Sequence, residues 1–250
     1  MAGDGRVSAY YDFGGGVLNH KATFPTYLTK FCFCRSTQPA IVLSHWDWDH
    51  WSSQGRDATA LQSDWIAPHQ RVGPVHFKFA SQLHASGRLL KWPAGLASVS
   101  LGPTMTIDKC TGSGRNHSGL AIAVTNQPAA TDKMLLPADA RYNVIPGSAA
   151  NQYLHVVVTH HGGRHRTTAK TPSASQLTSA AACSFGSPNS YGHPNAQALN
   201  DLAIAGYHKR RDTANRTPHP CGHIGLFWTL ASAAPALPCG ANCQRNITQF

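Results

Sequence analysis

The sequence predicts an α/β fold. Short runs rich in β-branched and aliphatic residues, typical of buried strands, alternate with segments whose apolar residues recur at helical spacing. Several of the strand-like runs end in aspartate or histidine, so potential metal ligands are expected at the ends of strands. Strands separated by helices in this way are typical of two mixed sheets covered by helices.

The expected elements follow from the spacing of apolar residues and from turn-forming residues between them. We expect strands at 7–12, 41–43, 65–68, 97–101, 120–124, 133–138, 155–158 and 180–185. We expect helices at 22–34, 75–90 and 194–207, and a loop followed by a helix at 51–62. The basic cluster 208–211 would then end the last helix, either in contact with phosphates or simply solvated.

Length and charge limit the choice of function. A chain of 250 residues that is 42% hydrophobic can bury one sizeable core, so we expect one domain at 1–210 and an extension at 211–250 packed on it. Lys and Arg number 21 against 11 Asp and Glu, giving a formal charge of +10. This excess favours a polyanionic partner such as nucleic acid, although a solvated basic face is the alternative.

The sequence gives no sign of export or membrane insertion. No apolar segment follows the polar N-terminus, and no run approaches the roughly 20 residues that span a bilayer. The seven cysteines are odd in number and lack a framework spacing, which predicts reduced thiols. We therefore expect a cytoplasmic protein without membrane contact.

The most informative stretch follows the apolar run 41–43. It places four potential ligands within six positions: His45, Asp47, Asp49 and His50. The first two are two residues apart and point the same way in an extended chain, whereas the last two can face a second ion as the chain turns. One loop can therefore serve two metal ions. The alternative is a polar surface loop between tryptophans.

Two later strands end in residues of the same kind. Asp139 follows one of them and is the natural bridging ligand, and His160 and His161 follow the next. Neighbouring residues leaving an extended strand point in opposite directions, so only one of these histidines is expected to be a ligand. His117, in a glycine-rich loop, could add a third imidazole to the first ion, unless its one-residue offset turns it away.

Four motifs occur in a fixed order along the chain: Asp12-Phe13-Gly14-Gly15-Gly16, the His45 to His50 stretch, Leu135 to Asp139, and Thr159 to Gly163 followed by Ser184 to Pro194. Together they resemble the metallo-β-lactamase fold and, within it, the nuclease-like domain of ComEC-type competence proteins. Asp47 stands where that signature usually has a second histidine. The resemblance implies a four-layer αβ/βα sandwich of two mixed sheets.

The resemblance also implies roles for individual residues. The first ion would be held by His45, Asp47 and Asp139, with His117 as a further candidate, and the second by Asp49, His50, His161 and Asp139. Asp12 would orient the His45 loop. Asp49, His160 and His193 would act in catalysis, and the substrate side would contain Asn189, Tyr191 and Ser118.

This ligand set suits hydrolysis of a phosphodiester. Two ions ~3.5–4 Å apart can polarise water near neutral pH and hold both oxygens of an in-line displacement. Three carboxylates make the set hard, so two Zn²⁺ or Mn²⁺ ions are expected, with Mg²⁺ as an alternative. The principal hypothesis is a metal-dependent phosphodiesterase, a nuclease acting on DNA or RNA. The alternatives are a metallo-hydrolase of a small ester, lactone or phosphorylcholine-like substrate, and a non-catalytic metal-containing module that binds a partner.

The C-terminal tail contains a separate candidate. Its cysteine and histidine residues could hold a structural zinc ion, although their spacing is not a standard one. They are His219, Cys221, His223, Cys239 and Cys243.

Overall fold

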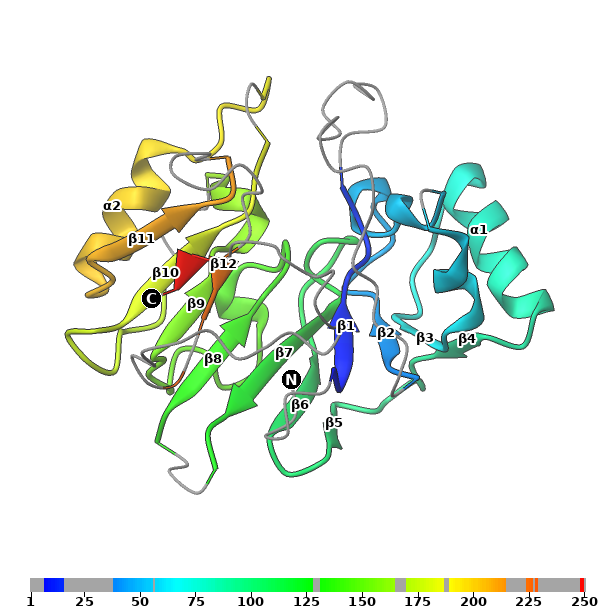
Figure 1. Ribbon diagram of the computed structural model, residues 1–250, viewed down its shortest axis with the longest axis horizontal. Coiled ribbons are helices and arrows are strands. Elements are labelled where there is room, and N and C mark those ends of the chain that lie inside the picture. The colour runs from blue at the N-terminus through cyan, green and yellow to red at the C-terminus, as the bar shows by residue number, and fades with distance from the viewer. Residues whose placement is uncertain are drawn as a thin grey trace. The chain divides into compact units, whose positions relative to one another are not determined.

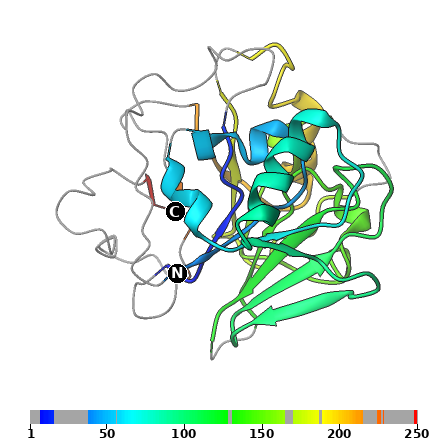
Figure 2. The same ribbon diagram turned by 90° about the vertical axis from the view of Figure 1, so that its right-hand side faces the viewer.

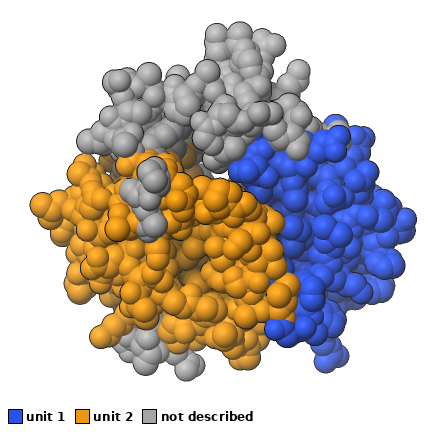
Figure 3. Space-filling view, turned by 90° about the horizontal axis from the view of Figure 1, so that it is seen from below, with its two compact units in different colours: residues 1–95, 233–245 blue, residues 96–232, 246–250 orange. Residues whose placement is uncertain are grey.

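The computed structural model forms two compact units, coloured separately in Figure 3; the described part of the first ends at Gly95 and the second begins at Leu96. The residues described are 7–15, 38–55, 57–127, 131–164, 170–186, 189–214, 224–226, 228 and 248–249. Outside them lie the expected helix 22–34, the tail cysteines and histidines, and three motif residues, Gly16, Ser187 and Pro188. The proposed domain at 1–210 with its extension stays a prediction.

The first unit is built on a four-stranded parallel sheet with the order β1-β2-β3-β4 (Figure 1). Its strands are β1 (Ala9–Tyr11), β2 (Ala40–Val42), β3 (Trp65–Ala67) and β4 (Leu89–Lys91). Three 3-10 helices, η2 (Trp48–His50), η3 (Ser52–Gly55) and η4 (Ala58–Gln62), follow β2. The helix α1 (Pro74–Ala85) connects β3 to β4.

The helix α1 is shorter than the predicted 75–90. Gly87 has φ +69°, and its N–H donates to the carbonyl of His84 while that of Arg88 donates to the carbonyl of Leu83. These two bonds form a Schellman motif, which ends the helix. The chain can then enter β4, where Leu89 pairs with Trp65.

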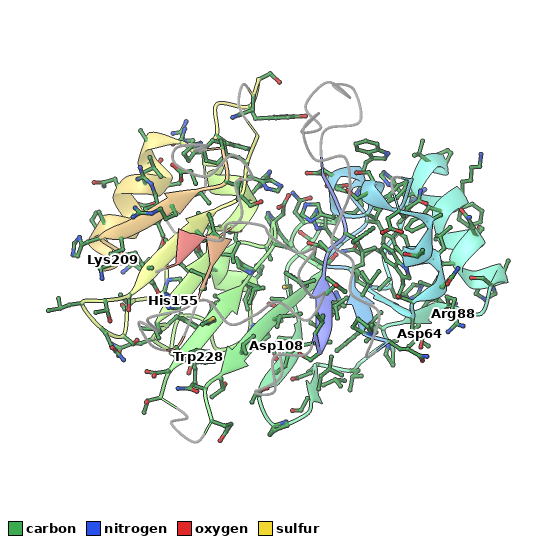
Figure 4. The ribbon with its side chains drawn as sticks, in the orientation of Figure 1. Asp64, Arg88, Asp108, His155, Lys209 and Trp228 are labelled. Carbon is green, nitrogen blue, oxygen red and sulfur yellow. The ribbon has the colours of Figure 1, made fainter. Side chains whose placement is uncertain are left out.

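Aromatic residues hold α1 against the sheet of this unit. Figure 2 shows the ribbon of α1 from the side that faces away from this sheet. Trp65 is fully buried, and its ring meets those of Phe79 and Phe13 edge to face at 5.2 and 6.4 Å. Its indole N–H donates to the carbonyl of Ala60. On the surface, Arg88 and Asp64 form an ion pair of 3.0 Å (Figure 4). This packed core supports β2, after which the candidate ligands begin.

The second unit contains a seven-stranded mixed sheet with the order β11-β10-β9-β8-β7-β6-β5. Neighbours are antiparallel from β5 to β8 and parallel from β8 to β11. The strands are β5 (Ser98–Leu101), β6 (Met105–Lys109), β7 (Leu120–Thr125), β8 (Lys133–Leu136), β9 (His155–Val157), β10 (Ala180–Cys183) and β11 (Lys209–Asp212). Two 3-10 helices, η5 (Tyr142–Val144) and η6 (Thr159–Gly162), flank β9, and β12 (Ile224–Gly225) pairs with β13 (Thr248–Gln249).

The helix α2 (Ala196–Ile204) lies between β10 and β11 in the chain. The Asn195 side chain caps its first turn by accepting the N–H of Gln197. Within the described residues, neither α2 nor α1 is long and apolar enough to cross a membrane.

The basic cluster after α2 is an edge strand, and its prediction as the end of a helix was wrong. The helix ends before Gly206, whose φ is +95°, and β11 then pairs in parallel with β10. Lys209, Arg210 and Arg211 are exposed there; Figure 4 labels the first of them. Charged side chains protect sheet edges from further pairing, so an edge strand does not need the apolar alternation that reveals a strand in the sequence.

Candidate metal centre

The loop after β2 carries the four candidate ligands of the first unit. His45 and His50 are buried, at 1% and 4% exposure, and their ring centroids are 4.0 Å apart. Asp47 and Asp49 are partly exposed, on either side of the first residue of η2. Two imidazoles and two carboxylates thus gather within one turn of the chain.

Asp12, at the end of β1, organises this loop. Its carboxylate accepts hydrogen bonds from the Ser44 backbone N–H at 2.7 Å, the Ser44 hydroxyl at 2.8 Å and His50 Nδ1 at 2.8 Å. Gly14 follows in close contact with the same loop, because a Cβ there would lie 1.6 Å from the carbonyl oxygen of Asp49. The Asp-Phe-Gly-Gly motif therefore serves as a support for the ligand loop.

The hydrogen-bond partners determine which ring nitrogen of each histidine faces the carboxylates. A carboxylate only accepts, so His50 Nδ1 must donate to Asp12. The Ser44 hydroxyl gives its proton to that same carboxylate and therefore accepts from His45 Nδ1, 3.0 Å away. In the neutral imidazoles, the lone pair is then on Nε2. The Nε2 atom of His45 lies 3.3 Å from Asp47 Oδ2, and that of His50 lies 3.7 Å from Asp49 Oδ2.

A nitrogen lone pair opposite a carboxylate oxygen is repulsive unless a proton or a cation lies between them. Metal-ligating histidines commonly donate their other ring N–H to an oxygen, as these two do. The donor set of this loop therefore fits a divalent cation.

We expect the Asp12→Asn variant to bind divalent metal about 10–100-fold more weakly, the usual effect of losing a residue that orients a ligand. The Ser44 N–H, the Ser44 hydroxyl and His50 Nδ1 all donate to the two oxygens of the Asp12 carboxylate. The asparagine amide has only one oxygen and would place an N–H group against some of these donors. Zn²⁺ titration against a chromogenic chelator measures the change. Asp64→Asn, on the surface of the same unit, is the matched control and should bind as the wild type does. Equal affinities of the two variants would contradict this role of Asp12.

The second unit has a buried carboxylate of its own, with two histidines beside it. Asp139 is 5% exposed, and its Oδ2 accepts from the Asn116 amide at 3.4 Å. His161 Nε2 lies 3.6 Å from its Oδ1, and His160 Nε2 lies 3.8 Å from its Oδ2. His161 Nδ1 donates to the carbonyl of Ser184 at 2.6 Å, so the lone pair of the neutral ring again faces a carboxylate.

The expectation that the adjacent histidines point in opposite directions was wrong. His160 and His161 lie in the turn η6 with φ of 50° and 56°, both left-handed, and not in extended chain. Both rings therefore reach Asp139. They differ in exposure, with side chains 43% and 29% exposed, and in the Ser184 bond that only His161 is seen to make.

A loop after β10 brings further rings to this turn. His193 lies 5.7 Å from the ring of His160 and stacks on Tyr191 at 5.8 Å with an angle of 18°. Burial lowers the pKa of His193, and the neighbouring His160 and His161 lower it further. Gly163 leaves room for this approach, because a Cβ there would lie 2.9 Å from His193 Cε1.

The Asn189 side chain is engaged with its own loop. Its Oδ1 accepts the His193 N–H at 2.9 Å, and its amide donates to the carbonyls of His193 at 2.8 Å and Gly186 at 3.0 Å. These bonds make it a support for the loop. Direct contact between Asn189 and a substrate stays a prediction.

The glycine-rich loop before β7 carries two candidate site residues, Ser118 and His117, which have different surroundings. The Ser118 hydroxyl donates to the Gly114 carbonyl at 2.7 Å. His117 is half-buried and, in the described part of the chain, joins no cluster of three or more ligand-type side chains. The neighbouring Asn116 is the residue that reaches Asp139.

Sequence reasoning missed Ser44 and the carbonyl of Ser184. Each one orients an imidazole, but its partners lie far away in the chain: Asp12 is 32 residues from Ser44, and His161 is 23 residues from Ser184. No local pattern marks either position.

No family model, curated protein or solved structure matches this chain. The described residues show an α/β protein with a parallel and a mixed sheet. Its buried histidine and aspartate residues could hold a metal ion. The relation to metallo-β-lactamase proteins rests on the sequence motifs and stays a prediction.

Proposed function

We propose that this protein is a divalent-metal-dependent phosphodiesterase that hydrolyses nucleic acid. The orientation of three imidazoles carries the proposal. His45, His50 and His161 each donate from Nδ1 to an oxygen outside the proposed ligand set and direct Nε2 toward a carboxylate. Ligand histidines in metalloproteins are held in this way.

The sequence motifs support a centre of two ions in a four-layer sandwich, with Asp139 as a ligand to both. One ion is assigned to His45, Asp47 and Asp139, and the other to Asp49, His50, His161 and Asp139. Divalent ions bound there would polarise water and neutralise charge on the phosphoryl group. The carboxylate-rich set accepts Mn²⁺ or Mg²⁺ as well as Zn²⁺.

His160 and His193 are proposed to handle the proton of the leaving group. His160 is the more exposed of the adjacent histidines and has His193 against its ring. The lowered pKa of His193 favours its neutral form at pH 7, in which it can take up the proton that the attacking water loses and then give it to the departing oxygen. A positioned pair of this kind suits protonation of a departing oxygen.

The basic side chains of β11 support nucleic acid as the substrate. Lys209, Arg210 and Arg211 are exposed on the strand beside β10, and Arg211 is in register with Ala182 near the carboxyl end of β10. The Ser184 carbonyl, which orients His161, follows that same end. Phosphates held along β11 would thus approach the carboxyl ends of the neighbouring strands, where the histidines lie.

The test uses purified protein stripped of metal and then supplied with Mn²⁺, Zn²⁺ or Mg²⁺. We expect metal-dependent cleavage of an aryl phosphodiester and of oligonucleotides, and oligonucleotide affinity that falls steeply with salt because bound phosphates release counterions. The double variant Lys209→Gln/Arg211→Gln should weaken oligonucleotide binding and flatten its salt dependence. It should leave aryl phosphodiester cleavage unchanged.

Three outcomes would contradict the proposal. Turnover of a small ester without any phosphodiester cleavage would indicate a different hydrolase. Tight metal binding without turnover would indicate a non-catalytic module. Oligonucleotide binding that does not change with salt would exclude the basic strand as the holding element.

A further inference from the structure

We propose that Tyr191 is a stacking platform for an unpaired nucleobase, so that this site takes single-stranded nucleic acid. The inference rests on the proposed function and names the substrate class of the same site. All the residues that carry it belong to the second unit.

Tyr191 presents an aromatic ring to solvent. It is 61% exposed, although it also stacks on another ring. His193 backs one face of it, with the ring planes 18° from parallel. A flat ring supported from behind and open to solvent is the kind of surface on which bases stack, and it accepts any base because every base has a π face.

The loop that carries the ring is held in place before any ligand binds. Asn189 bonds to both the N–H and the carbonyl of His193, and Gly192 takes the left-handed conformation that the turn requires, with φ +67°. The Asn195 N–H donates to the carbonyl of Gly162, which ties the loop to the turn η6. A ring fixed in this way loses little entropy on binding.

A continuous series of rings connects this platform with the buried carboxylate. Tyr191 stacks on His193 at 5.8 Å, and His193 lies 5.7 Å from His160. His160 Nε2 in turn lies 3.8 Å from Asp139 Oδ2. A base on Tyr191 would therefore belong to a nucleotide next to the phosphate that is cleaved at the proposed metal centre.

The geometry favours an unpaired base over two other ligands. A base inside a duplex has both faces covered by its neighbours, so it cannot stack on a side chain without leaving the helix. A choline group is recognised by several aromatic rings arranged as a cage, whereas Tyr191 offers one flat face. The net charge of +10 also disfavours a cationic ligand.

The experiment measures binding by full-length protein of a fluorescent phosphorothioate single strand, which resists hydrolysis, and of an abasic strand with the same length and charge. Tyr191→Ala should weaken binding of the base-containing strand roughly 5–150-fold, which corresponds to the ~1–3 kcal/mol of one stacked base. Tyr191→Phe retains the ring and should bind within about twofold of the wild type. Neither substitution should change binding of the abasic strand.

Several results would overturn the assignment: an equal loss for both strands, no loss for either, no binding of the single strand by the wild type, or tighter binding of a duplex. These experiments distinguish failure of the Tyr191 platform from failure of the proposed function. Wild-type protein that cleaves phosphodiesters, with Tyr191→Ala unchanged in affinity, rejects the platform alone. Base-dependent binding through Tyr191 without cleavage by any metal form rejects the phosphodiesterase and keeps the platform.

Discussion

The Asp139→Ala variant is expected to lose most of its bound metal and to hydrolyse phosphodiesters at the background rate. Asp139 is the buried carboxylate that both adjacent histidines face, and it is the proposed bridge between two ions. Without a bridging charge, the two cations would repel one another. The loss of metal affinity should exceed the roughly 10–100-fold that follows from removing a residue that only orients a ligand.

Metal content per chain, measured by mass spectrometry on purified protein, tests this expectation. Asp132→Ala is the matched control in the same unit, because its carboxylate contacts the surface residue Gln176. The control should retain its metal and its activity. Two metal equivalents in Asp139→Ala would reject the bridging role, and one equivalent with residual activity would restrict Asp139 to a single ion.

Alanine substitutions of the two adjacent histidines are expected to have different effects. His161→Ala should lose metal and activity together, because the Ser184 carbonyl fixes the ring so that Nε2 faces Asp139. His160→Ala should keep its metal and lose about 10²–10⁴-fold in rate, the usual contribution of a positioned acid or base. His160 has the more exposed ring, as expected of a group that meets a substrate.

Metal counting and single-turnover rates on both variants separate these roles. If His160→Ala is the metal-depleted variant, the two roles are reversed. If both variants lose metal, both histidines are ligands, and proton transfer falls to His193, whose ring lies against His160. Retention of full metal content and full activity by both would remove the histidine pair from the centre.

The elements predicted most successfully were those whose pattern is local. The strands β3, β5 and β10 occur within the ranges expected from short apolar or alternating runs. The helix α1 began at Pro74, one residue before the predicted start, but ended at Ala85, because the Schellman motif at Gly87 terminates it. The edge strand β11 was missed because its residues are charged and only pairing with β10 makes it a strand.

The sequence by itself determined where the ligand-type side chains, aspartate and histidine, follow strands, because a strand and the residues after it are adjacent in the chain. Only the tertiary structure decided how these side chains are turned. The left-handed turn η6 directs both histidines to Asp139, and His50 receives its partner Asp12 from 38 residues away. The orientation of an imidazole depends on which oxygen holds its other nitrogen. When that oxygen lies on a distant segment, no local pattern can encode it.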